Sequence, residues 1–253
     1  MFGKNVTRGH DDDQRKDALD VVAIFPTIQG EGPLAGTPAV FVRLAHCNLK
    51  CTFCDTEFSQ GVQRVNTRDL VMVIQEHSFS LTPGRVRPRG LVVITGGEPF
   101  RQPISDLCRW LIDGDYTVQI ETAGALAPHP EDSVWVSGAL RYEDEFRVVV
   151  SPKTPTLAPL FKDALLDVNM PNVVAKYIVR EGDTSLANLL PTQGQGSRGP
   201  WWSEDLPVGK TYVQPMDEQN EEQNARNVAA AVKLCSDYGY RLSLQQHKIV
   251  GVP

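Results

Sequence analysis

Three closely spaced cysteines are the residues whose type and spacing point most directly to chemistry. Cys47, Cys51 and Cys54 form a C-x3-C-x2-C pattern. Thiolates are soft ligands, and several of them on one loop can surround a metal centre. A closed zinc site needs four tetrahedral ligands, and the sequence has no second C-x2-C pair to complete one. The pattern therefore favours an iron–sulfur cluster with three protein ligands and one iron left open to a small molecule.

Other polar or glycine-containing motifs recur just after segments expected to be strands. In parallel α/β proteins, binding and catalytic groups gather in the loops that follow the carboxyl ends of the strands. We therefore expect one functional site at one end of the sheet. Its members are the segment around Cys47, the pair Gly96 and Gly97, the pair Glu121 and Thr122, the run Ser151, Pro152 and Lys153, and the pair Gln214 and Pro215.

The elements that must position these motifs alternate along the chain from residue 21 onward. Strands are expected at residues 21–25, 39–44, 91–94, 117–120, 146–150, 173–179, 211–214 and 242–246. Helices are expected at residues 69–77, 104–112 and 220–238, the last with Ala225, Val228, Val232 and Cys235 on its buried side. This alternation predicts a mostly parallel α/β fold.

The division of the chain follows from its composition. Residues 1–19 are polar and are expected to form a flexible N-terminal extension, and residues 20–253 to form one domain. Residues 124–145 and 191–207 interrupt the alternation. For the second stretch, a mobile lid carrying Trp201 and Trp202 competes with an ordinary surface loop.

Composition and charge restrict the class of protein. The chain has 253 residues, of which 41% are hydrophobic and 22% charged, as in soluble globular proteins. Its net charge of -6 argues against a general nucleic-acid binder. No apolar stretch is long enough to span a membrane, and the acidic start is unlike a secretory signal. Five cysteines, an odd number, do not suggest a secreted disulfide framework. We therefore expect a cytoplasmic protein.

The cysteine pattern, with Phe53 directly before the last cysteine, resembles the signature of the radical S-adenosylmethionine (SAM) superfamily. The resemblance implies a full or partial TIM-type barrel and a [4Fe–4S] cluster whose open iron is chelated by SAM. Reductive cleavage of SAM would then yield methionine and a 5′-deoxyadenosyl radical. The run Gly96, Gly97, Glu98 and Pro99 resembles the motif that meets the SAM amino group in this superfamily, and glycines allow such a close backbone approach.

Further runs narrow the resemblance to the 7-carboxy-7-deazaguanine synthases of deazapurine biosynthesis. They include residues 25–32, the pairs Glu121 and Thr122 and Gln214 and Pro215, and a chain end at Pro253. The resemblance implies conversion of 6-carboxy-5,6,7,8-tetrahydropterin to 7-carboxy-7-deazaguanine with loss of ammonia, by a lyase that regenerates SAM and is assisted by Mg²⁺. It also implies a homodimer and a reductant such as flavodoxin, with neither a nucleic-acid nor a membrane partner.

The resemblance also implies roles for individual residues. Thr56 would bind Mg²⁺, since a hydroxyl is a hard oxygen ligand. Arg43 would pair with the substrate carboxylate. The other substrate-binding residues would be Ile28, Gln29, Gly30, Thr95 and Pro253, the last through its terminal carboxylate. The SAM-binding residues would be Phe53, Asp55, Gly97, Glu98, Ser151, Pro152, Lys153 and Gln214.

Structural roles compete with several of these assignments. Arg43 could serve as a salt-bridged barrel residue, Thr56 as a turn or helix-cap hydroxyl, and Lys153 as a surface ion pair. The sequence also departs from the family pattern at His46, where glycine is common, and at Ala123, where a polar residue is expected.

Two other functions also fit the cysteine spacing. A glycyl-radical enzyme activase shares the cluster and a compact barrel but would need a surface for its protein partner. A binding module stapled by zinc would need no catalytic residues at all.

Overall fold

The computed structural model describes residues 7–10, 17–54, 56–81, 90–186 and 205–253. These residues form one nine-stranded sheet in the order β3-β1-β2-β4-β5-β6-β7-β8-β9. Strand β1 pairs antiparallel with β2 and β3, and every other neighbouring pair is parallel. The strands are β1 (Ala18–Ile28), β2 (Pro38–Leu44), β3 (Gln63–Asn66), β4 (Leu91–Gly96), β5 (Thr117–Thr122), β6 (Phe146–Val150), β7 (Val173–Val179), β8 (Thr211–Pro215) and β9 (Arg241–Leu242).

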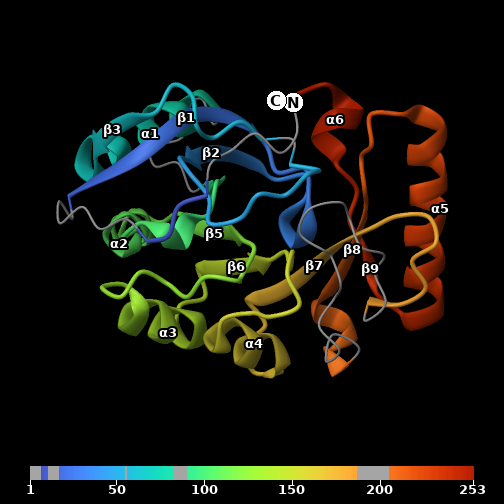
Figure 1. Cartoon of the computed structure of the whole chain (residues 1–253). Helices are drawn as coiled ribbons and strands as arrows, with labels where there is room; N and C mark the ends of the chain where they lie inside the picture. The colour runs from blue at the N-terminus through green and yellow to red at the C-terminus, as the bar shows by residue number, and fades with distance from the viewer. Residues whose placement is uncertain (1–6, 11–16, 55, 82–89, 187–204) are drawn as a thin grey trace.

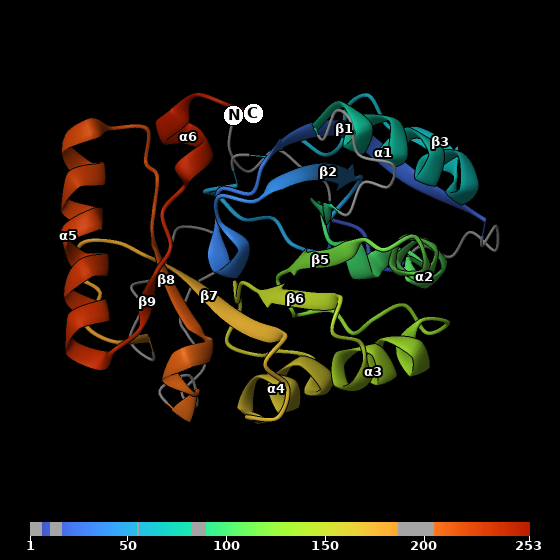
Figure 2. The same ribbon diagram turned by 180° about the vertical axis from the view of Figure 1, so that it is seen from behind.

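The sheet curves into an open barrel whose two edge strands are β3 and β9. Most of the helices follow one another around its outer side, and the short α6 lies beside the N-terminal strands (Figures 1 and 2). This arrangement confirms the expected mostly parallel α/β fold and is consistent with a partial TIM-type barrel. The helices are α1 (Thr67–Leu81), α2 (Ser105–Asp113), α3 (Ser133–Tyr142), α4 (Pro159–Leu166), α5 (Glu221–Tyr238) and α6 (Gln246–Val250).

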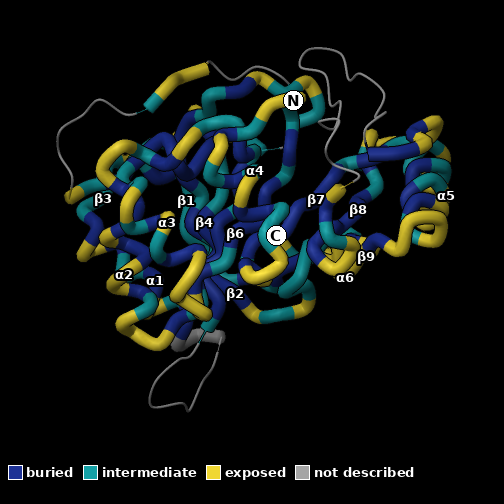
Figure 3. Tube along the Cα trace, turned by 90° about the horizontal axis from the view of Figure 1, so that it is seen from below, coloured by how far each residue is buried: buried dark blue, intermediate teal, exposed yellow. Residues whose placement is uncertain are grey.

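The hydrophobic core lies between the outer face of the sheet and the helices. Val92 and Ile94 of β4, Val148 of β6 and Leu107 of α2 are all fully buried within it. Figure 3 shows this buried layer running through the central strands, with the exposed residues on the outer sides of the helices. Parallel strands covered on both faces have such continuous apolar runs, which is why the sequence identified most of them. Of the described residues, no helix combines the length and the apolar character needed to cross a membrane.

The long helix α5 buries a different face from the one expected. Its buried residues are Asn227, Ala231 and Leu234, whereas Val228 and Val232 are 38% and 44% exposed. The side chain of Asn227 decides the orientation, because it accepts a hydrogen bond from the Glu181 amide at 2.9 Å and donates one to the Met216 carbonyl at 3.0 Å. The bond to Met216 is buried and the bond from Glu181 is partly buried, so turning the apolar face inward would leave backbone groups unsatisfied.

The C-terminal segment also differs from the expectation. The strand expected at residues 242–246 ends after Arg241–Leu242, and residues 246–250 form α6 instead. The Ser243 amide still donates to the Val213 carbonyl, but the Gln246 amide bonds the Gly30 carbonyl and starts the helix. Gly251 ends it in the left-handed conformation, with φ of 72°.

Some elements were not anticipated, and some expectations lie outside the described residues. Helix α3 lies within the interruption at residues 124–145, and β3 and α4 were also missed. The core begins earlier than residue 20, because Leu19 of β1 is fully buried. The stretch 191–207, with Trp201 and Trp202, lies outside the described residues as far as residue 204.

Candidate active site

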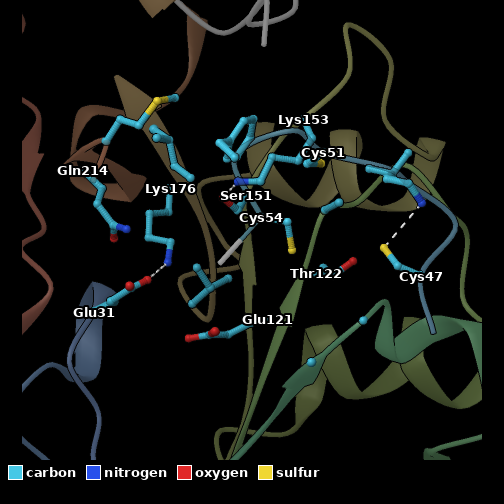
Figure 4. A pocket seen from close by; sticks show the side chains of 18 of the residues that line it. Glu31, Cys47, Cys51, Cys54, Glu121, Thr122, Ser151, Lys153, Lys176 and Gln214 are labelled. Atoms are coloured by element: carbon cyan, nitrogen blue, oxygen red, sulfur yellow. Dashed lines mark hydrogen bonds and ion pairs between the residues drawn. The ribbon is translucent and has the colours of Figure 1, made fainter. Parts of the chain in front are cut away.

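A cavity opens at the carboxyl end of the parallel strands, as the placement of the motifs predicted. Its wall includes Cys47 after β2, Gly97 after β4, Thr122 at the end of β5, Ser151 after β6 and Gln214 at the end of β8. Figure 4 shows side chains from these separate strands facing one another across the cavity. The parallel sheet therefore collects residues that are far apart in the sequence.

The three cysteines line this same cavity. Burial raises the pKa of the Cys47 thiol to about 12, and the charges of Cys51 and Cys54 add to the increase. The Cys47 sulfur accepts a hydrogen bond from the Leu49 amide at 3.4 Å. Amide donors of this kind stabilise a cluster thiolate.

A single metal ion and an iron–sulfur cluster are the two kinds of centre that compete for these thiols. Among the described residues, no three His, Cys, Asp or Glu side chains converge on one point as a single metal ion would require. In a [4Fe–4S] cluster each cysteine binds a different iron, so its ligands are more widely separated. The described residues therefore supply no tetrahedral zinc site, whereas three free cysteines on one loop are a donor set that a [4Fe–4S] cluster accepts.

The backbone of the cysteine loop is packed tightly against the loop after β4. His46 has a φ of 65°, in the left-handed region that glycine adopts most easily, which explains why glycine is common at this position in the resembled family. The carbonyl of His46 accepts a hydrogen bond from the Glu98 amide at 2.9 Å. A Cβ atom on Gly97 would lie only 1.6 Å from this carbonyl oxygen, so residue 97 has room for glycine alone.

Lys153 lines the cavity directly beside the cysteine loop (Figure 4). The Lys153 ammonium donates to the Ser151 hydroxyl at 2.6 Å and lies 5.5 Å from the centre of the Phe53 ring. Burial lowers the pKa of Lys153 to about 8. These contacts exclude the surface ion pair that competed for Lys153, and they direct a cation at the thiols and at any anion bound beside them.

Two residues assigned to SAM lie behind the cavity wall. Pro152 is buried. The Glu98 carboxylate, 1% exposed, accepts hydrogen bonds from the Thr122 hydroxyl at 2.7 Å and the Ala123 amide at 3.1 Å. Burial raises its pKa to about 7. Glu98 therefore ties the loop after β4 to the end of β5, and its neighbour Gly97 presents the backbone that lines the cavity. Asp55 lies outside the described residues.

A second cavity adjoins the first and contains most of the residues assigned to the substrate. Its lining includes Ile28, Gln29, Arg43, Thr56, Thr95 and Pro253. Four residues line both cavities, which makes them two parts of one site: Glu31, Gly96, Glu121 and Gln245. The Glu121 carboxylate lies at the junction, where it accepts hydrogen bonds from the Gln29 amide nitrogen at 3.0 Å and the Thr95 hydroxyl at 3.2 Å.

The C-terminus reaches this second part of the site. The Thr27 hydroxyl donates to a Pro253 main-chain oxygen at 2.6 Å. Gly30 does not line the cavity but supports this arrangement, because its carbonyl accepts from the Gln246 amide at 3.0 Å. A Cβ atom on Gly30 would lie 2.0 Å from the His247 ring. Residue 30 therefore lets the C-terminal segment approach closely.

Sequence reasoning assigned no role to a buried ion pair at the centre of the site. Glu31 pairs with Lys176 of β7 and also accepts a hydrogen bond from Gln245 at 2.8 Å (Figure 4). Lys176 stands in an apolar strand and Glu31 in a glycine-rich turn, and a charged residue inside an otherwise buried strand was the available signal. The pair joins the first loop of the sheet, β7 and the C-terminal segment.

Two known proteins that are similar to this chain over its full length share one name. A protein of Rickettsia prowazekii is 37% identical over 100% of this chain and 96% of its own length, and one of Rhodospirillum rubrum is 35% identical over the whole of both chains. Both are named 7-carboxy-7-deazaguanine synthase. The crystal structure of QueE from Escherichia coli shares the fold, with a TM-score of 0.58 and 20% identity over 90% of this chain and 94% of that one. No family model matches the sequence.

Proposed function

The chain belongs to the family of 7-carboxy-7-deazaguanine synthases, and we propose that its two-part cavity converts 6-carboxy-5,6,7,8-tetrahydropterin to 7-carboxy-7-deazaguanine with loss of ammonia. As a member of that family it is a radical SAM lyase whose cofactors are a [4Fe–4S] cluster and SAM. The observation that carries the proposal is the continuity of the cavity. Glu31, Gly96, Glu121 and Gln245 line both the part with the thiols and the part with the substrate-binding candidates.

In the first part of the cavity, Cys47, Cys51 and Cys54 would hold the cluster. The cluster and SAM, when bound, supply the one-electron chemistry that starts the reaction. The remaining wall suits SAM: the Gly97 backbone can meet its amino group, and the Lys153 ammonium its carboxylate. Ser151 holds that ammonium by its hydrogen bond of 2.6 Å. The proposed SAM site is completed by Phe53, Asp55, Gln214 and the buried residues Glu98 and Pro152.

In the second part, polar groups are arranged for a flat heterocycle that carries a carboxylate. Arg43 can pair with the carboxylate, and its guanidinium carbon lies 5.3 Å from the centre of the Phe25 ring, which restricts its position. The terminal carboxylate of Pro253 can accept hydrogen bonds from the guanidine-like edge of the pterin. Thr95 and Gln29 are both bonded to Glu121, so these three side chains present one connected polar surface.

Three finer elements belong to the proposal. Thr56 lines the substrate part of the cavity, as Arg43 does, which supports Thr56 as a residue that would hold Mg²⁺ through its hydroxyl oxygen. A flavodoxin-type reductant would supply the electron, and the chain would act as a homodimer. The glycyl-radical activase is not favoured, because the relatives that match the full length of this chain are named 7-carboxy-7-deazaguanine synthase.

An anaerobic assay tests the function. Reconstituted protein is supplied with SAM, Mg²⁺, a strong reductant and 6-carboxytetrahydropterin, and the products are identified by mass spectrometry. We expect 7-carboxy-7-deazaguanine from the native protein and from the control Cys235→Ala, and none from Cys51→Ala. Cleavage of SAM without conversion of the pterin would contradict the proposed substrate while leaving the cluster site intact.

A further inference from the structure

We propose that residues 7–10, called here the N-terminal strap, position the first cluster cysteine by holding its backbone from outside the cavity. Thr7 forms a parallel bridge with Cys47, and the Arg8 amide donates a hydrogen bond to the Cys47 carbonyl at 2.8 Å. Thr7, Arg8 and Gly9 are exposed, and none of the four strap residues lines the cavity. The strap thus reaches the cysteine through backbone contacts alone.

The strap is one of two segments that bond to successive carbonyl groups of the cysteine loop. The His46 carbonyl accepts a hydrogen bond from the Glu98 amide at 2.9 Å, and the Cys47 carbonyl accepts one from the Arg8 amide of the strap at 2.8 Å. His46 itself has a left-handed backbone, with φ of 65°. Because two neighbouring carbonyls are bonded to different segments, the direction of the Cys47 side chain depends on both contacts.

A second anchor lies at the far end of the strap. His10 bonds through its Nε2 to the Ala127 carbonyl at 3.0 Å. Its ring also packs edge-on against His129, with ring centres 5.6 Å apart. Both partners belong to the loop between β5 and α3. The strap therefore connects this loop to the cysteine loop that follows β2, and both loops start at the end of the sheet where the cavity opens.

This role differs from the flexible extension that the composition suggested. A free tail would have no effect on the cysteines, whereas the strap should restrain Cys47 more than Cys51 or Cys54, which it does not touch through any described contact. The inference rests on the proposed function only in naming Cys47 a cluster ligand. The restraint itself can be measured in metal-free protein, where a failure of the proposed reaction has no influence.

A pair of variants at one position isolates the contact. Arg8→Pro removes the amide donor, whereas Arg8→Ala keeps it and removes the same charge. A proline at position 8 also suits Thr7, because the residue before proline favours extended backbone. In full-length metal-free protein, the rate of iodoacetamide alkylation is measured at each cysteine by peptide mass spectrometry, with Cys51 and Cys235 as internal references.

We expect Cys47 to be alkylated about fivefold faster in Arg8→Pro than in Arg8→Ala, the factor that corresponds to one lost hydrogen bond. The reference cysteines and the midpoint of thermal unfolding should be unchanged. His10→Ala should also raise the alkylation rate of Cys47. In reconstituted protein, Arg8→Pro should lose iron to a chelator faster than Arg8→Ala. Equal alkylation of Cys47 in the two variants, or an equal increase at all cysteines, would overturn the proposal.

Discussion

At the cluster end of the cavity, backbone groups and a glycine hold the cysteine loop, whereas at the substrate end side chains from distant segments hold the C-terminus. The contact of Gly97 with the His46 carbonyl leaves no space for any side chain. At the other end, Thr27 and Pro253 are 226 residues apart in the sequence and joined by one hydroxyl. From this difference we expect substitutions that change side-chain volume to have their largest effect on activity at the cluster end. At the substrate end, changes of charge and hydrogen bonding should matter more.

The largest effect is expected from Gly97→Ala. The new Cβ would meet the His46 carbonyl at 1.6 Å and would displace the loop that carries Cys47. A displacement of about 1 Å near the reacting groups can cost on the order of 100-fold in rate, so we expect kcat to fall by at least that factor. The measurement is the anaerobic assay, together with iron content.

Gly138→Ala provides the control, because a Cβ on Gly138 of α3 would meet nothing within 4 Å. This variant should retain full activity and the native iron content. If Gly97→Ala also kept both, the close packing of the cluster end would not matter for catalysis.

The cluster end was also the more predictable of the two ends. Its residues belong to short runs, such as the cysteine triplet and Gly96 with Gly97, and apolar strands place such runs at one edge of the sheet. The face of α5 was not predictable in this way, because the buried hydrogen bonds of Asn227 outweigh the periodicity of its valines. At the substrate end only the resemblance named residues, since nothing local in the sequence joins Gln29 to Glu121, 92 residues away.

The ion pair of Glu31 and Lys176 shows the same limit. Its partners are 145 residues apart, and their side chains are 14% and 7% exposed. Spacing cannot predict such a pair, because it depends on how the barrel closes. Once the fold is known, burial explains the pair, since a buried charge is strongly destabilising without a partner.

Substitution of Lys176 removes this ion pair. Lys176→Met leaves the Glu31 carboxylate buried without its cation and should lower the free energy of unfolding by about 3–5 kcal/mol. Adding Glu31→Gln in the same chain should restore most of that loss, because the buried charge is then gone. Chemical denaturation measures both variants. Equal stability of the single and double variants would show that the charge of Glu31 is not what the lysine compensates.

The ion pair also makes the stability of the protein depend on pH. Burial would raise the pKa of Glu31, but the Lys176 ammonium and the hydrogen bonds of Lys176 and Gln245 lower it from 4.5 to about 2. A carboxylate whose pKa is lowered by folding contributes stability that is complete above pH 4.5 and is lost as the pH falls towards 2. The native protein should therefore lose more stability across this range than the double variant does.

A smaller effect is expected at Gly30, where the substrate end approaches the C-terminal segment. A Cβ on Gly30 would lie 2.0 Å from the His247 ring and 2.9 Å from the His247 amide nitrogen, so both the ring and the start of α6 would have to shift. We expect Gly30→Ala to raise the KM for the pterin about tenfold, within the usual cost of overpacking, and to leave the KM for SAM unchanged. Gly209→Ala, with nothing within 4 Å, is the control. An equal rise in both KM values would mean that the two ends are not separable.

The smallest effect is expected from the exposed ion pair of α6. Comparing it with a similar pair on α5 separates the effect of losing a charge from the effect of where that charge lies. Lys248 bonds Asp217 at 2.7 Å, and Lys233 bonds Asp237 at 2.6 Å, so the two pairs have nearly equal geometry. Both are exposed enough that Lys248→Met and Lys233→Met should each change the free energy of unfolding by less than about 1 kcal/mol.

Only Lys248 lies on the helix that leads to Pro253, and its partner Asp217 lines the cluster part of the cavity. Lys248→Met should therefore raise the KM for the pterin about two- to threefold, the effect of a weak exposed ion pair, whereas Lys233→Met should not change it. If Lys248→Met also left this KM unchanged, the contacts of Thr27, Gly30 and Glu31 would hold the C-terminal segment without the exposed ion pair. The substrate end would then depend on its buried interactions, and the exposed ion pair on α6 would make no contribution to substrate binding.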